Sequence, residues 1–107
     1  IIDAYKCQER GIKNIIDTIH HRVGSKAAYL TVDIDVLDPA YAPGTGTPVS
    51  GGLTSSQLLM TLNNIMDIDF RGMDIVEVAP PYDHADITAI AASTVVQHYI
   101  QGLAYKK

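Results

Sequence analysis

The chain has 107 residues, of which 47% are hydrophobic, and its formal net charge is −4 at pH 7. This composition indicates one globular unit and excludes both a disordered chain and the basic surface that nucleic-acid binding needs. One cysteine excludes an internal disulfide framework, and no apolar run approaches the roughly 20 residues that span a bilayer. We therefore expect a cytoplasmic protein without a nucleic-acid or membrane partner. Because the first residue is Ile1 and not Met, we also expect the chain to be part of a longer gene product.

The first third of the chain predicts a strand end, a helix and a central strand. Residues 1–4 are apolar and are expected to end a strand, and residues 5–11 form a polar connection. Apolar residues then recur at helical spacing over residues 12–23, and Gly24 ends this helix. Residues 27–34 are nearly continuously apolar, which is typical of a parallel strand covered on both faces.

A long loop over residues 37–54 separates this strand from the second half of the chain. It is rich in proline, which restricts the backbone, and in glycine, which lets the backbone approach a neighbour closely. A loop of this length in a compact domain is typically functional.

The second half repeats the helix and strand alternation. Thr54 and Gln57 form a capping box before a second helical stripe, and residues 72–78 predict another strand that carries Asp74 and Glu77. We interpret Asp74 as structural and expect Asp86 to cap the last helix. The order of elements predicts an α/β fold with a parallel sheet.

Two carboxylates mark the end of the central strand. Asp33 and Asp35 are separated by one apolar residue, so in an extended strand they project from the same face about 7 Å apart. Two like charges there are unfavourable unless a cation lies between them, and carboxylate oxygens suit Mg, Mn or Ca. Glu77 follows the next strand. Because ligands bind beyond the carboxyl ends of parallel strands, Asp33, Asp35 and Glu77 mark the candidate site.

Three segments resemble the ureohydrolases, the family of arginase and agmatinase enzymes. They are DIDVLDPAYAPGTGTP (residues 33–48), GGLT (residues 51–54) and GMDIVEVAPPYD (residues 72–83). The residues of the first and third segments, and of the segment that leads to Tyr29, are most similar to those of a bacterial agmatinase. The resemblance covers essentially the whole chain.

This resemblance implies a three-layer α/β/α fold with an eight-stranded parallel sheet and two bridged Mn ions. Asp33 and Asp35 match the family's catalytic metal ligands, Asp33 holding both ions and Asp35 one. Glu77 matches the residue that binds the substrate's guanidinium group. The implied reaction is hydrolysis of agmatine to putrescine and urea, in polyamine biosynthesis, by a homo-oligomer that is a trimer or a hexamer.

The sequence also departs from the family pattern. The upstream metal-binding motifs GGDH and DAHxD are absent, and only about three of the eight strands are expected. We therefore interpret residues 1–107 as the C-terminal segment of a single ureohydrolase domain. The isolated chain is predicted to be inactive.

Other functions stay open from the sequence. A different guanidino-acid hydrolase, such as a guanidinobutyrase, would use the same residues. The DIDV segment also matches the DxDx[TV] motif of a haloacid-dehalogenase-like phosphatase, in which Asp33 would be the nucleophile. A third possibility is an inactive fragment that serves in assembly. His84, after Glu77, is either a residue of the substrate entrance or a surface histidine.

Overall fold

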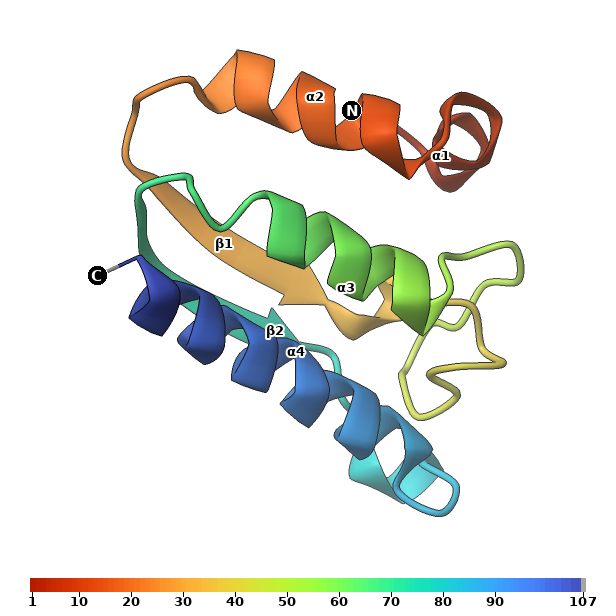
Figure 1. Cartoon of the computed structure of the whole chain (residues 1–107). Helices are drawn as coiled ribbons and strands as arrows, with labels where there is room; N and C mark the ends of the chain where they lie inside the picture. Colours follow the sequence, from red (N-terminus) through yellow and green to blue (C-terminus); the bar gives the residue numbers. More distant parts are fainter. Residues whose placement is uncertain (107) are drawn as a thin grey trace.

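The computed structural model describes residues 1–106, in which helices and parallel strands alternate after residue 12 (Figure 1). The helices are α1 (Ala4–Arg10), α2 (Ile12–Val23), α3 (Ser55–Asn64) and α4 (Ile87–Tyr105). The strands are β1 (Ala28–Asp33) and β2 (Phe70–Val76), and two 3-10 turns are η1 (Ile34–Val36) and η2 (Pro80–Tyr82). The strands lie side by side and parallel, with α3 in the crossover between them. The predicted α/β class with a parallel sheet is confirmed.

The segment before residue 12 is a helix, so the prediction of a strand end and a connection there is wrong. The Asp3 carboxylate accepts a hydrogen bond from the Lys6 N–H (2.8 Å) and begins α1. Gly11, at φ +78°, ends this helix and leads directly into α2. Because α1 buries no residue, the sequence has no apolar stripe from which periodicity would detect a helix.

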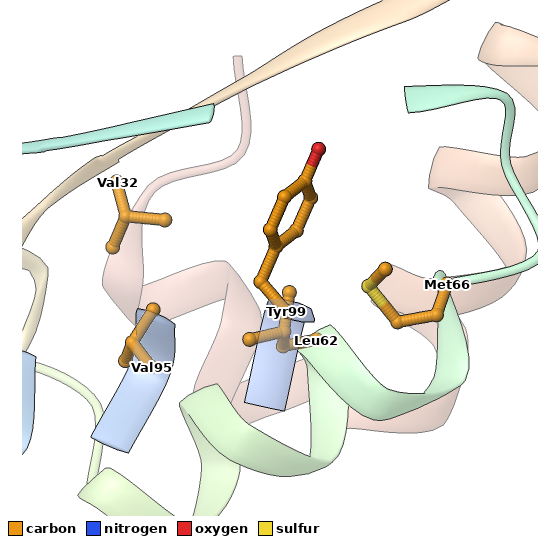
Figure 2. Packing of buried hydrophobic residues seen from close by; sticks show 5 residues of the cluster. All are labelled: Val32, Leu62, Met66, Val95 and Tyr99. Carbon is orange, nitrogen blue, oxygen red and sulfur yellow. The ribbon is translucent and has the colours of Figure 1, made fainter. Parts of the chain in front are cut away.

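The main core lies between the sheet and the two helices that follow β1 and β2. Figure 2 shows its buried side chains, which come from β1, from α3 and the turn after it, and from α4: Val32, Leu62, Met66, Val95 and Tyr99. Burying each such side chain contributes roughly 1.5–3 kcal/mol. This packing places α3 and α4 on one face of the sheet and fixes both strands relative to each other.

The other face of the sheet carries a polar contact between the strands. The Asp74 carboxylate on β2 accepts hydrogen bonds from the hydroxyls of Thr31 (2.5 Å) and Tyr29 (3.2 Å) on β1. Its two oxygens therefore tie the strands together, which agrees with the interpretation of Asp74 as a structural carboxylate. Tyr29 on this face is 61% exposed, so the face is not covered within residues 1–106. These residues therefore supply the sheet and a helical layer on its other face.

A second core fixes the long loop against α4. It consists of buried residues from η1, the loop and α4: Ile34, Leu37, Ala42, Leu53 and Ala92. Leu37 and Leu53, near the two ends of the loop, form a parallel bridge, and the Leu53 N–H donates to the Val36 carbonyl (2.9 Å). The loop is therefore closed at its base and packed at both ends, whereas residues 46–51 are exposed. Within residues 1–106, no helix combines the length and apolar character that crossing a membrane requires.

Candidate active site

Asp33 and Asp35 both lie at the carboxyl end of β1, but a turn and not the strand places Asp35. β1 ends at Asp33, whose carboxylate accepts a hydrogen bond from the Asp35 N–H (3.2 Å) and caps η1. The predicted strand over residues 27–34 therefore runs too far at its end, and strand alternation does not orient Asp35. Ile34, between the two carboxylates, is fully buried and anchors the turn.

Asp35 has a second fixed contact, which comes from the long loop. The Thr47 hydroxyl donates a hydrogen bond to Oδ2 of Asp35 (3.0 Å). Asp35 is half-buried, whereas Asp33 is exposed. Within residues 1–106, Oδ2 of Asp33 and Oδ1 of Asp35 accept no further hydrogen bond, so both carboxylates keep an oxygen for another group.

The loop is shaped by Asp38 near its start. The carboxylate of Asp38 accepts the N–H groups of Ala40 (2.9 Å) and Gly51 (2.8 Å), and these donors hold the pKa of Asp38 below its usual value. A Cβ on Gly52 would overlap the backbone of Leu37 and Asp38. The expectation that glycine allows close backbone approach here is confirmed.

Gly44 anchors the middle of the loop to the connection between β2 and α4. Its N–H donates to the hydroxyl of the fully buried Thr88 (2.7 Å), and its carbonyl accepts the Ala79 N–H (2.8 Å). A Cβ on Gly44 would lie 2.6 Å from the Cβ of Asp83, so only glycine fits. Gly46, two residues further along the loop, lies near Glu77.

Glu77 lies one residue beyond β2, at the same end of the sheet as Asp33. The predicted strand over residues 72–78 is therefore placed two residues too late, and Glu77 is not part of it. The strand register pairs Asp33 with Val76, and a Cβ on Gly46 would lie 4.0 Å from Oε2 of Glu77. Glu77 is exposed and adopts φ +68°, a left-handed conformation that is strained for a residue other than glycine. Strain of this kind is concentrated at functional sites.

The three predicted site residues therefore lie at the same edge of the sheet, Asp33 and Asp35 after β1 and Glu77 after β2. Residues 1–106 contain no group of three or more histidine, cysteine, aspartate or glutamate side chains that could hold a metal ion. Asp33 and Asp35 thus offer two carboxylates with hard oxygen donors, and no third such side chain from this part of the chain joins them. The side chain that the sequence argument missed is Thr47, which lies twelve residues from Asp35.

The cap of α4 also differs from the prediction. Asp86 directly precedes the helix, but it adopts φ +59° and its side chain makes no capping hydrogen bond. Asp83 caps instead: Oδ1 accepts the N–H groups of His84 (3.0 Å) and Thr88 (2.9 Å), and Oδ2 accepts that of Ala89 (3.0 Å). His84 is exposed in this connection.

This cap predicts an acid-sensitive contribution to stability. Partial burial raises the pKa of Asp83, but the N–H donors of Thr88 and Ala89 outweigh it and hold the pKa below the ordinary 3.8. The contribution is complete above 3.8 and is lost as pH falls through the folded-state value. Asp83→Asn keeps one acceptor oxygen but loses the charge and the second acceptor, so it is expected to lower the melting temperature by a few degrees at neutral pH and by less in acid.

Thermal melts of Asp83→Asn and Asp86→Asn, from neutral pH to below 3.8, check this expectation. Asp86→Asn removes the same charge without a capping hydrogen bond and should melt like the wild type throughout. An Asp83→Asn deficit that is as large in acid as at neutral pH would show that the charge of the cap is unimportant.

Known proteins share both the sequence and the shape of the chain. The family model described as the arginase family matches residues 1–101. Proteins named agmatinase from Cronobacter sakazakii and Citrobacter koseri are 50% and 48% identical over all 107 residues. The chain spans only 35% of each of these relatives, about a third of their length.

Solved structures agree with these matches. A hypothetical agmatinase from Burkholderia thailandensis superposes with a TM-score of 0.92 at 47% identity, over 95% of this chain and 32% of that one. The proclavaminate amidino hydrolase from Streptomyces clavuligerus gives a TM-score of 0.89 at 42% identity, over 92% of this chain and 34% of that one.

Proposed function

Because the chain belongs to the arginase family, we propose that it supplies one edge of a ureohydrolase active site, in a protein that hydrolyses agmatine to putrescine and urea. The resemblance to the ureohydrolases is confirmed by the family match, and the arginase-like fold by the structural neighbours. What carries the proposal is the placement of Asp33, Asp35 and Glu77 at the carboxyl ends of two adjacent parallel strands.

Asp33 and Asp35 would hold the divalent ions, which we propose to be Mn. Their carboxylates fit such ions because they are hard oxygen donors, and each keeps an oxygen that accepts no hydrogen bond within residues 1–106. Bound ions would supply a hydroxide at neutral pH by lowering the pKa of a coordinated water. The remaining ligands would come from outside this part of the chain.

Glu77 would bind the substrate's guanidinium group. A guanidinium is planar and pairs best with a carboxylate, through two N–H groups directed at two oxygens. Glu77 is exposed at the edge where Asp33 lies, so its carboxylate is free to orient the guanidinium carbon toward the ions. Family membership favours this chemistry over the phosphatase alternative, in which Asp33 would be a nucleophile.

The proposal is tested on the complete gene product that carries these residues. We expect Mn-dependent urea release with agmatine as the fastest substrate, ahead of guanidinobutyrate and arginine, and we expect a chelator to abolish it. Fastest turnover of guanidinobutyrate would identify the alternative guanidino-acid hydrolase. Hydrolysis of a phosphate ester without urea release would overturn the proposal.

The same assay should be run on a chain of residues 1–107 alone. Two carboxylates do not complete a binuclear metal site, so we expect no urea release from it. Measurable urea release by this chain would show that Asp33 and Asp35 suffice, or that self-association completes the site.

A further inference from the structure

Thr47 is the one side chain of the long loop that hydrogen-bonds to the Asp33–Asp35 pair within residues 1–106. Its hydroxyl lies 3.0 Å from Oδ2 of Asp35 and can only act as the donor, because an ionised carboxylate has no proton to give. A hydroxyl bonded to a carboxylate is charge-assisted and roughly twice as strong as a neutral pair. Within residues 1–106, Oδ2 of Asp35 thus accepts a hydrogen bond from Thr47, and Oδ1 accepts none.

The backbone around Thr47 is held on both sides. Upstream, Gly44 is bonded to the buried hydroxyl of Thr88 and to the Ala79 N–H. Downstream, Pro48 restricts the backbone, and the loop closes at the bridge between Leu37 and Leu53. The Thr47 side chain is exposed. Because the backbone is restrained on both sides of it, its hydroxyl is held close to Asp35.

The loop also joins the two halves of the candidate site. Thr47 touches Asp35, and its neighbour Gly46 lies beside the carboxylate of Glu77. The same short piece of backbone therefore lies next to Asp35 on one side and next to Glu77 on the other.

We propose that Thr47 is a positioning residue that fixes the carboxylate of Asp35 for the divalent cation, an inference that rests on the proposed function. Without the hydroxyl, the carboxylate turns freely about its last bond and must be ordered when the ion binds. Partners that orient a metal ligand in this way typically change metal affinity or activity 10–100-fold when they are removed.

The chain offers a matched control two residues away. The Thr45 hydroxyl is buried and has no hydrogen-bond partner within residues 1–106. Thr45→Val therefore makes the same chemical change in the same loop without removing a contact described here. Because it also relieves an unsatisfied buried hydroxyl, it should not lower stability.

The experiment measures Mn affinity of the complete gene product, by titration of the metal-free protein, together with its melting temperature. We expect Thr47→Val to bind about 10–100-fold more weakly than the wild type, and Thr47→Ser and Thr45→Val to bind like the wild type. Recovery by serine would tie the effect to the hydroxyl, and a melting temperature that Thr47→Val leaves unchanged would separate it from loop unfolding.

Three results would overturn the inference. Thr47→Val with wild-type affinity would show that the hydroxyl does not position Asp35. Thr45→Val with the same loss as Thr47→Val would show a general effect of the loop. A wild type that binds no Mn and releases no urea would overturn the proposed function and this inference with it, whereas the first two results leave the proposed function standing.

Discussion

Asp35→Asn is expected to reduce both the Mn affinity and the urea release of the complete gene product by more than about 100-fold. Loss of a partner that merely orients a ligand already costs 10–100-fold, and here the proposed ligand itself loses its charge. The amide is also a poorer ligand for a hard ion, and it disturbs the hydrogen bond from Thr47 to Oδ2. Asp33→Asn should have an effect of the same size.

Titration with Mn and steady-state urea assays of both variants measure this. Asp38→Asn is the matched control. Asp38 lies three residues after Asp35, but its carboxylate accepts hydrogen bonds from the N–H groups of Ala40 and Gly51. It should lower the melting temperature and change Mn affinity far less than Asp35→Asn does. If Asp35→Asn keeps the affinity of the wild type, Asp35 is not a metal ligand.

Glu77→Gln is expected to reduce kcat/KM for agmatine by roughly 30-fold to several-thousand-fold. Removing one partner of a desolvated, hydrogen-bonded charge pair costs about 2–5 kcal/mol, and each 1.36 kcal/mol is a factor of ten. Glutamine keeps the size of the side chain and one acceptor oxygen, but it loses the charge and the two-oxygen match to a guanidinium. Mn affinity should stay unchanged, because Glu77 is not proposed as a ligand.

Kinetics of Glu77→Gln and Asp86→Asn over a range of agmatine concentrations test this assignment. Asp86 is a suitable control, since it is exposed, follows the same strand and also has a positive φ (59°). Its variant should match the wild type. A Glu77→Gln variant that loses Mn affinity in parallel with activity would instead make Glu77 a metal ligand.

Helices that bury an apolar stripe were predictable from the sequence. Thr54 and Gln57 form both hydrogen bonds of the capping box (3.0 and 2.9 Å), and Gly24 ends α2 as expected. α1 was not predictable from periodicity, because it is held by the Asp3 cap and by Gly11 and buries nothing. Its one sequence signal was an aspartate before a short polar segment.

The candidate site was located by its place at the strand ends, but its local geometry was not predictable. Asp35 is placed by a turn that the Asp33 side chain caps, and α4 is capped by Asp83, in a connection where Ala85 and Asp86 both have positive φ. Thr47 contacts Asp35 from a loop that is also anchored at Gly44. Contacts that depend on how a loop folds back leave no local pattern in a sequence.

The left-handed backbone of Glu77 sets stability against function at this position. A residue other than glycine in that conformation costs of order 1–3 kcal/mol, and glycine would remove the cost. Replacement by glycine would also remove the carboxylate proposed to bind the guanidinium. A screen that selects only for heat resistance would therefore favour loss of Glu77, and engineering of a more robust enzyme must hold this position fixed while it improves others.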